Sequence, residues 1–242
     1  MSTVITTTVL PRDGTNTLNI GAAGDTVAIG GDSLNLNVLQ DAGGNNIFTS
    51  SSGTVSSTSL AGILKLLSTQ TASASASISF TTGIDSTYDI YIFKFINVRS
   101  DTDNTTFGFQ ANVSGQSGYN EVMTTTAFRA YHDESPGTTS ALVYQSGWAQ
   151  SQGTGFQLLA ADMANDADMA LCGELYLFNP ASTTYVKNFY TRTQNGHYGN
   201  YSIDIHIGGY FNTTGAITQV QFKLASGNLT SGTIKLYGLS KT

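Results

Sequence analysis

Runs of apolar, β-branched and aromatic residues alternate with short polar turns from residue 77 onward. The clearest run, residues 88–98 (YDIYIFKFINV), carries apolar side chains at both odd and even positions. That pattern is typical of a strand covered on both faces. Similar runs span residues 105–113, 121–131, 141–145, 155–160, 170–178, 184–192, 201–211, 216–224 and 232–239. Closely spaced strands joined by Gly, Asn, Asp and Ser turns, without an amphipathic helix, predict an all-β fold. We expect a β-sandwich of jelly-roll type over residues 62–242.

Residues 1–48 have a different pattern, in which apolar runs of about four or five residues alternate with Gly-rich turns. Such short strands, with few large side chains, cannot form a core by themselves. We therefore predict an extended Gly-rich N-terminal β arm that packs against identical chains or along a partner surface. The alternative is a decorated edge of the main domain.

Residues 49–61 are rich in Ser, Thr and Gly and have no apolar period, which predicts a flexible linker between the arm and the sandwich. The residues that follow allow two structures. The spacing of a helix face is matched by Leu60, Ile63, Leu64 and Leu67. Because that pattern covers only about two turns, too few for a stable isolated helix, we favour a strand over residues 64–71.

The composition argues against several classes of function. Charged residues make up 11% of the chain, against about 25% in an average soluble domain. The 10 basic residues are scattered, so the chain lacks the basic patch that binds nucleic acid. No apolar run is long enough to span a membrane, and residues 1–10 lack the features of a secretory signal. We expect no nucleic-acid binding, no membrane insertion and no export by a signal peptide.

The sequence offers few groups for metal or redox chemistry. The single cysteine, Cys172, excludes an intramolecular disulfide, and its apolar neighbours predict a small buried side chain. Acidic loops at residues 101–104 and 160–168 carry oxygen ligands of the kind that calcium binds. We favour turns in both places, because Asp and Asn are common turn residues. No metal site and no cofactor are predicted.

The motifs of common hydrolases are absent from the sequence. It contains no Gly-x-Ser-x-Gly elbow, no His-Glu-x-x-His motif and no phosphate-binding loop. Residues 132–134 (His-Asp-Glu) offer acid–base groups, but neighbours on an extended chain point in opposite directions. The 16 acidic residues are scattered, so a pair of glycosidase carboxylates is neither indicated nor excluded. The sequence therefore predicts a protein that is not an enzyme.

Aromatic and amide side chains gather in two Gly-containing loops. Residues 194–201 (QNGHYGNY) contain His197, Tyr198 and Tyr201, and the only tryptophan, Trp148, lies in the other loop. Aromatic faces stack on the C–H faces of sugar rings, and neighbouring amides bond the sugar hydroxyls. These four residues are the candidate glycan contacts. The alternative is that their rings cover the ends of the sandwich core.

Five stretches within residues 64–239 have characteristic sequence patterns of turns and strands. They are 66–71 (LLSTQT), 80–89 (FTTGIDSTYD), 130–134 (AYHDE), 173–180 (GELYLFNP) and 232–239 (GTIKLYGL). These motifs resemble those of structural proteins of marine and cyanobacterial tailed bacteriophages, which are described as tail-fibre or virion structural proteins. The shared stretches contain no catalytic signature, so the resemblance transfers no active residue.

The resemblance implies a non-enzymatic virion protein, a fibre or appendage that is assembled in the host cytoplasm and released by lysis. The N-terminal arm would dock to other virion proteins, the chain would form a homotrimer, and the β-sandwich would contact the host surface and its glycans. Two alternatives stay open. One is a capsid decoration or head-fibre protein, and the other is a polysaccharide depolymerase.

Overall fold

A computed structural model describes residues 38–40, 46–51, 54–56, 64–135 and 139–239 of the chain. The chain divides into two compact units, Met1–Leu60 and Ala61–Thr242. Three short antiparallel strands form a sheet in the first unit: β1 (Val38–Gln40), β2 (Asn46–Ser51) and β3 (Thr54–Ser56). Most of the arm predicted over residues 1–48 lies outside the described residues.

The polar stretch predicted as a linker, residues 49–61, contains paired strand. Ser50 of β2 lies opposite Val55 of β3, so the backbone is hydrogen-bonded on both sides of residues 52–53. Thr and Val favour extended backbone, and strands this short can pair without an apolar period. The rest of the predicted linker, residues 57–61, lies outside the described residues.

The second unit is built from strands, as the sequence predicts. Its strands are β4 (Leu64–Thr71), β5 (Ile78–Phe80), β6 (Ile90–Ser100), β7 (Thr105–Val113), β8 (Met123–Asp133), β9 (Ser140–Tyr144), β10 (Gln157–Met163), β11 (Leu171–Phe178), β12 (Lys187–His197), β13 (Tyr201–Phe211), β14 (Ile217–Leu224) and β15 (Leu229–Leu239). The strand expected over residues 64–71 is confirmed as β4 with the same ends. Among the described residues, no helix is long and apolar enough to cross a membrane.

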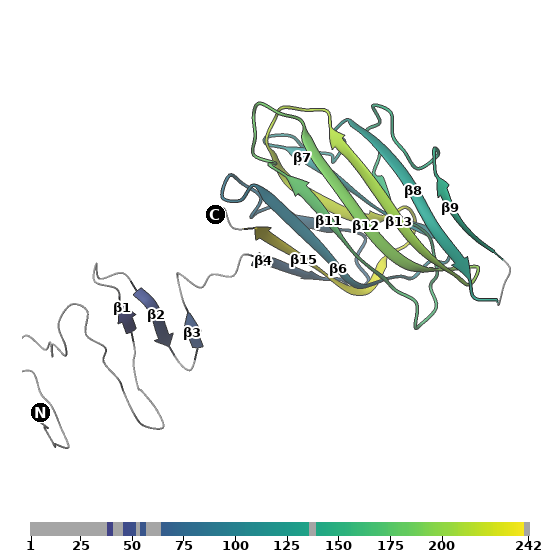
Figure 1. Ribbon diagram of the computed structural model, residues 1–242, viewed down its shortest axis with the longest axis horizontal. Coiled ribbons are helices and arrows are strands. Elements are labelled where there is room, and N and C mark those ends of the chain that lie inside the picture. Colours follow the sequence, from purple (N-terminus) through teal and green to yellow (C-terminus); the bar gives the residue numbers. More distant parts are fainter. Residues whose placement is uncertain (1–37, 41–45, 52–53, 57–63, 136–138, 240–242) are drawn as a thin grey trace, which may run out of the picture. The chain divides into compact units, whose positions relative to one another are not determined.

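The strands of this unit form a nearly closed antiparallel sandwich (Figure 1). One layer, here called the broad sheet, has the order β4-β15-β6-β11-β12-β13-β8-β9. The other layer, the narrow sheet, has the order β5-β14-β7-β10. The two layers join along one edge, where Met163 of β10 pairs with His197 of β12. The hairpins β8–β9 and β12–β13 together extend the broad sheet beyond β11.

Aromatic side chains fill the space between the two sheets. Alternate residues of a strand point to the same face, so Phe93 and Phe95 of β6 both turn inward. Phe93 meets Phe222 of β14 at 5.2 Å between ring centroids, and Phe95 meets Phe107 of β7 at 5.4 Å. Both pairs are edge-to-face, the arrangement that the charge distribution of the rings favours. These contacts join the broad sheet to the narrow one.

The loop between β9 and β10, residues 145–156, continues along the edge of β8. Backbone bonds connect it to β8, including one from the N–H of Thr125 to the carbonyl of Gln150. The fully buried side chain of Gln157 holds the loop from the other side. Its Nε2 donates to the carbonyl of Trp148 at 3.0 Å, and its Oε1 accepts from the hydroxyl of Thr125 at 2.7 Å. This buried network fixes the position of the Trp148 backbone beside β8.

Candidate functional site

A hollow of about 470 Å³ lies where β8 meets the hairpin formed by β12 and β13. It is called the aromatic hollow, and it is lined by Arg129, Tyr131, Thr139, His197, Tyr198, Gly199, Tyr201 and Ile203. Strand pairing brings these residues together, because Tyr131 of β8 lies opposite Ile203 of β13 and His197 of β12 lies opposite Tyr201 of β13. Strand alternation then puts the side chains of Arg129 and Tyr131 on the same face of β8.

The walls of the aromatic hollow are rings held against one another. His197 stacks on Tyr198 with 4.6 Å between ring centroids, and its edge meets Tyr201 at 5.1 Å. Tyr201 in turn meets Tyr131 edge-on at 6.0 Å. The turn is closed by a backbone bond from the N–H of Asn200 to the carbonyl of His197. Tyr198 is 45% exposed, so its ring is partly accessible to a ligand at the hollow.

His197 is held as a neutral ring. Its Nδ1 accepts the N–H of Gly199 at 2.7 Å, so the ring proton resides on Nε2, which lies 3.4 Å from Oδ2 of Asp162. Burial lowers the pKa of His197 below its ordinary value of 6.5, and nearby Arg129 acts in the same direction against the opposing effect of Asp162. Protonation of Nδ1 would also break the bond from Gly199. The imidazole therefore contributes a ring face and no charge at neutral pH.

Arg129 supplies the positive charge at the hollow. Its guanidinium lies 4.8 Å from the ring centroid of Tyr131 and 5.0 Å from that of Trp148. The nearest carboxylate oxygen, Oδ2 of Asp162, is 3.6 Å from the Nη1 atom, which is ion-pair distance and longer than a hydrogen bond. The buried Nε atom has no hydrogen-bond partner among the described residues. Ring contacts, rather than hydrogen bonds, thus hold this guanidinium in place.

The four residues predicted as glycan contacts fall in one neighbourhood. His197, Tyr198 and Tyr201 line the aromatic hollow, whereas the ring of Trp148 contacts the guanidinium of Arg129, which is itself a lining residue. Trp148 and Tyr201 also pack on the core, as the alternative interpretation of these rings expected. Sugar contact itself stays a prediction. The aromatic pattern of the sequence does not indicate Arg129 and Tyr131, although their alternation on a strand before a turn can be read in residues 128–134.

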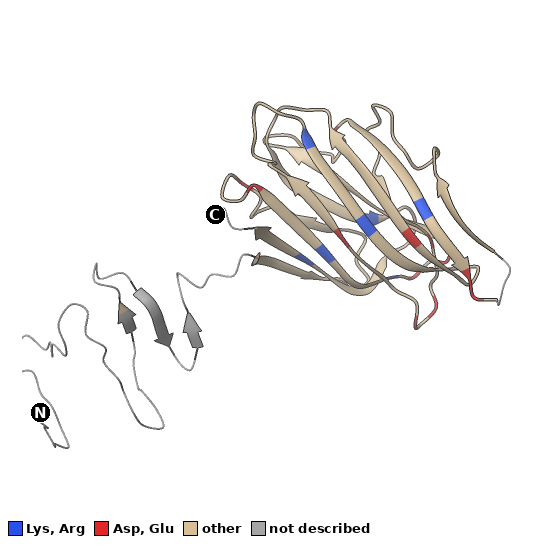
Figure 2. Cartoon of the chain, in the orientation of Figure 1, with Lys and Arg blue, Asp and Glu red and all other residues tan. Residues whose placement is uncertain are grey.

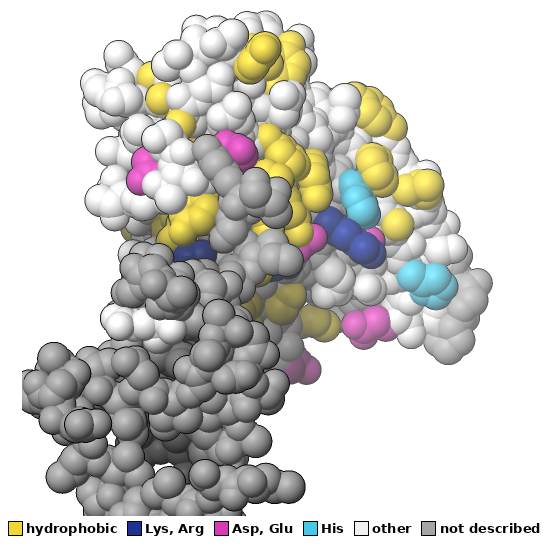
Figure 3. Space-filling view, turned by 60° about the vertical axis from the view of Figure 1, so that its left-hand side comes forward, with side chains coloured by type: hydrophobic (Ala, Val, Ile, Leu, Met, Phe, Trp, Pro, Cys, Tyr) yellow, Lys and Arg dark blue, Asp and Glu magenta, His cyan; other side chains and the backbone are white. Residues whose placement is uncertain are grey.

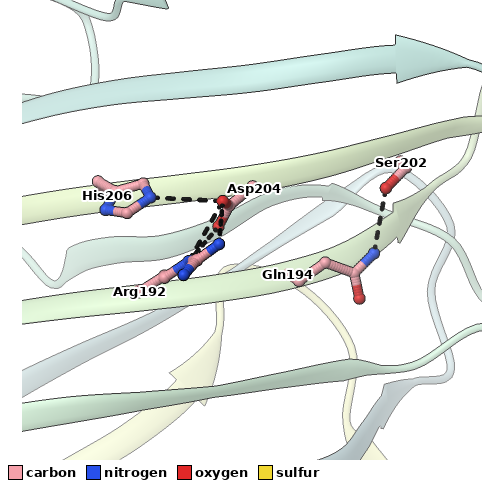
Figure 4. Close-up of polar contacts among 5 residues, drawn as sticks. All are labelled: Arg192, Gln194, Ser202, Asp204 and His206. Atoms are coloured by element: carbon pink, nitrogen blue, oxygen red, sulfur yellow. Dashed lines mark hydrogen bonds and ion pairs between the residues drawn. The ribbon is translucent and has the colours of Figure 1, made fainter.

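A second hollow, of about 400 Å³, lies on the outer face of the broad sheet. It is called the outer-face hollow, and it is lined by Lys94, Cys172, Gly173, Glu174, Arg192, Gln194 and Asp204. Figure 4 shows Arg192 reaching Asp204 on the neighbouring strand, where its Nη2 donates to Oδ2 at 2.9 Å and its Nε donates to Oδ1 at 3.1 Å. The Lys94 ammonium on β6 donates to Oε2 of Glu174 on β11. Both cations that line the outer-face hollow, Lys94 and Arg192, are therefore already paired with carboxylates.

Electrostatic pairing also sets the ionisation of Asp204. Burial acts to raise its pKa, but hydrogen bonds and charge from Arg192 and His206 outweigh that effect, and the pKa is lowered overall.

Figure 3 shows that apolar side chains gather beside charged ones on this side of the molecule. Figure 2 shows that charged residues are sparse across the sandwich and form no basic patch in that view. The outer face thus presents paired charges among apolar groups.

The prediction that Cys172 is buried is wrong. Its side chain is exposed at the outer-face hollow, where Sγ lies 3.4 Å from Oδ1 of Asn97. Strand alternation explains the difference, because Leu171 takes the inward position on β11 and is fully buried. The apolar run of residues 170–172 therefore covers both faces of the strand instead of lying wholly inside.

The acidic stretch at residues 101–104 is a turn, as expected, whereas the stretch at residues 160–168 begins within β10, which includes Asp162, and turns only after Met163. Oδ1 of Asp101 accepts the N–H of Asn228 at 2.8 Å and the hydroxyl of Thr102 at 2.8 Å. Asp162 faces Arg129 and His197 at the aromatic hollow. Over the part of the chain that the structure describes, no group of three or more His, Cys, Asp or Glu side chains is arranged to hold a metal ion.

No protein-family model, curated protein or solved structure matches the chain. The resemblance of residues 64–239 to phage structural proteins therefore stays a prediction from the sequence motifs.

Proposed function

We propose that this chain is a non-enzymatic structural protein of a tailed-phage particle, and that its β-sandwich binds a glycan of the host surface through the aromatic hollow. The proposal combines the motif resemblance of residues 64–239 with one structural observation, the gathering of His197, Tyr198 and Tyr201 around a single hollow. Its volume of about 470 Å³ is within the range of small-ligand sites, about 300–1,000 Å³.

The chemistry of the aromatic hollow suits a sugar ring. Sugars present C–H faces that stack on aromatic rings and hydroxyls that need hydrogen-bond partners. Tyr198 offers a partly exposed ring. Tyr131 and Tyr201 also line the hollow, and each tyrosine hydroxyl can donate and accept a hydrogen bond. Rings and hydroxyls at one place support glycan binding.

Binding fits this hollow better than hydrolysis does. Hydrolysis of a glycosidic bond ordinarily needs two carboxyl groups on opposite sides of that bond. None of the described residues that line the aromatic hollow is Asp or Glu. The neighbouring carboxylate, Asp162, faces Arg129 and His197. We therefore favour a receptor-binding role over that of a depolymerase.

We also infer that the sandwich is a jelly roll. In support, β4-β15-β6-β11 are neighbours in one sheet and β5-β14-β7-β10 are neighbours in the other. This is the order of two interleaved Greek keys, with the hairpins β8–β9 and β12–β13 as insertions. Jelly rolls recur in viral capsid and lectin domains, which is compatible with a role in a virion but does not by itself assign one.

The remaining part of the proposal concerns assembly. The N-terminal arm is proposed to dock to other virion proteins and to hold the chain as a homotrimer. Light scattering on the full chain and on a chain that begins at residue 61 tests this. A trimer that becomes a monomer on truncation is expected, and a monomeric full chain would refute it. In the particle, density for this protein only on the capsid lattice would favour the decoration or head-fibre alternative.

The test of glycan binding uses fluorescently labelled full chain and cells of the host bacterium, with extracted surface polysaccharide as competitor. Tyr198→Ala removes the exposed ring and is expected to weaken binding about tenfold. Tyr185→Ala is the matched control, because Tyr185 is also exposed but precedes β12 at its opposite end. Equal binding by both variants and the parent chain would refute the proposed site. Release of reducing ends from the polysaccharide would instead favour the depolymerase.

A further inference from the structure

We propose that the aromatic hollow recognises an acidic sugar, a uronic or sialic acid residue whose carboxylate is bound by Arg129. This inference rests on the proposed glycan-binding function and specifies its ligand class. It adds Arg129 as the residue that determines specificity, a residue that the aromatic pattern of the sequence did not single out.

The first support is the unused hydrogen-bonding capacity of Arg129. A guanidinium has five N–H donors in a rigid plane, and a carboxylate accepts two of them side by side. None of these donors makes a hydrogen bond to a described residue, whereas Arg192 on the opposite face of the sheet forms three with Asp204. The side chain of Arg129 is only 23% exposed, so little of it is in contact with water.

The second support is the way in which the guanidinium is held. It lies near the rings of both Tyr131 and Trp148, at 4.8 and 5.0 Å from their centroids. Arginine stacked on aromatic rings keeps its plane fixed, so less conformational entropy is lost when its donors bond a ligand. The backbone of Trp148 is itself fixed by the buried side chain of Gln157. The donor group is thus organised before the ligand arrives.

The third support is the position of Asp162. Its Oδ2 lies 3.6 Å from Arg129 and 3.4 Å from Nε2 of His197, so it balances the buried charge without occupying the guanidinium donors. With His197 neutral, the local charges of Arg129 and Asp162 cancel. The net charge of the chain is −6, but salt screens such charges beyond about 8 Å. Selectivity for an acid therefore depends on direct bonds to Arg129.

The rest of the hollow accounts for the sugar part of the ligand. Tyr198 offers a partly exposed ring, and the hydroxyls of Tyr131, Tyr198 and Tyr201 can bond sugar hydroxyls. A neutral sugar would use these groups but would place only hydroxyls at Arg129. Because charge-assisted hydrogen bonds are about twice as strong as neutral ones, the acidic sugar is expected to bind about tenfold more tightly.

The experiment measures affinities by NMR titration of the full chain with six sugars. Methyl glycosides of glucuronic acid, galacturonic acid and N-acetylneuraminic acid are compared with those of glucose, galactose and N-acetylglucosamine. In the parent chain, at least one acid is expected to bind about tenfold more tightly than the neutral sugars. In Arg129→Met, which keeps an apolar side chain against the rings, this preference is expected to disappear while neutral sugars still bind.

The matched control is Arg192→Met, which removes a cation from the opposite face of the same sheet and is expected to leave the preference unchanged. Arg129→Lys keeps the charge but loses the planar donors, so it is expected to keep only part of the preference. It also serves as the test if Arg129→Met fails to fold. An acid preference that survives in Arg129→Met, or in Arg129→Lys at full strength, overturns the inference.

The two levels of the proposal fail in different ways. Equal binding of acidic and neutral sugars by the parent chain overturns the acidic-sugar inference and leaves glycan binding intact. Binding of none of the six sugars overturns both. An acid preference abolished by Arg192→Met and retained by Arg129→Met would place the acid in the outer-face hollow and refute the role of Arg129.

Discussion

Replacing Phe222 by alanine tests whether the aromatic core holds the two sheets together. Phe222 is fully buried on β14 of the narrow sheet. Its ring contacts those of Phe80, Phe93, Phe95, Phe107 and Phe109, at centroid distances from 5.2 to 6.2 Å. These neighbours belong to β5, β6 and β7, so they are anchored on both sheets. Removing Phe222 takes away the ring that all five share.

The size of the stability loss in Phe222→Ala follows from the burial of Phe222 and from the rigidity of the neighbouring rings. Phe→Ala in a core costs about 3–5 kcal/mol, including the cavity that remains. Because paired strands hold the surrounding rings, the cavity cannot close, and we expect a loss of about 4 kcal/mol in the free energy of unfolding. For a unit of this size that corresponds to a fall of about 8–16 °C in the melting temperature.

Urea unfolding followed by tyrosine and tryptophan fluorescence measures this loss. Phe128→Ala is the control, because Phe128 is 43% exposed on the outer face and stacks on His206. It is expected to cost less than about 1 kcal/mol. If Phe222→Ala does not fold, Phe222→Leu should still cost about 1–2 kcal/mol. A loss for Phe222→Ala no larger than that for Phe128→Ala would show that the shared ring does not hold the two sheets together.

Three further predictions concern the aromatic hollow and the outer face. Because the pKa of His197 is lowered in the folded chain, the unfolded chain binds more protons below about pH 6.5, and stability should fall as the pH drops through that range. Urea unfolding from pH 5 to pH 7.5 should show this slope reduced in His197→Gln, and an unchanged slope would contradict it. Gln157→Leu leaves the Trp148 carbonyl and the Thr125 hydroxyl without this partner, so unfolding should become easier by about 2–3 kcal/mol in the same assay, and a change below about 0.5 kcal/mol would oppose it. Cys172 is exposed, so a thiol reagent should label it in the folded chain without denaturant; labelling only after unfolding would show the side chain to be buried.

The sequence pattern located most strands of the sandwich because their inward positions are apolar. Residues 105–113 and 201–211 were predicted with the ends that β7 and β13 have. β12 was predicted over residues 184–192 but spans Lys187–His197. Its second half turns polar side chains inward, where Thr193 and Asn195 bond the carbonyls of Leu159 and Ala161. Buried polar residues that are satisfied by distant backbone are invisible to an apolar pattern.

The candidate site was predictable in part for a similar reason. His197, Tyr198 and Tyr201 are close in the sequence, so one loop revealed them. Arg129 becomes significant only through Trp148 and Asp162, which lie on distant segments of the chain. The packing of the loop at residues 145–156 and of β10 against β8, not the local sequence, brings these three side chains together. The short strand β5 escaped prediction because three residues carry too little pattern.

The most direct test of the central claim is a structure of the full chain with a bound host-surface oligosaccharide that contains uronic or sialic acid. We expect a sugar ring against Tyr198, with its carboxylate within hydrogen-bonding distance of the Arg129 guanidinium. A sugar bound only in the outer-face hollow, or one whose carboxylate points away from Arg129, would contradict it.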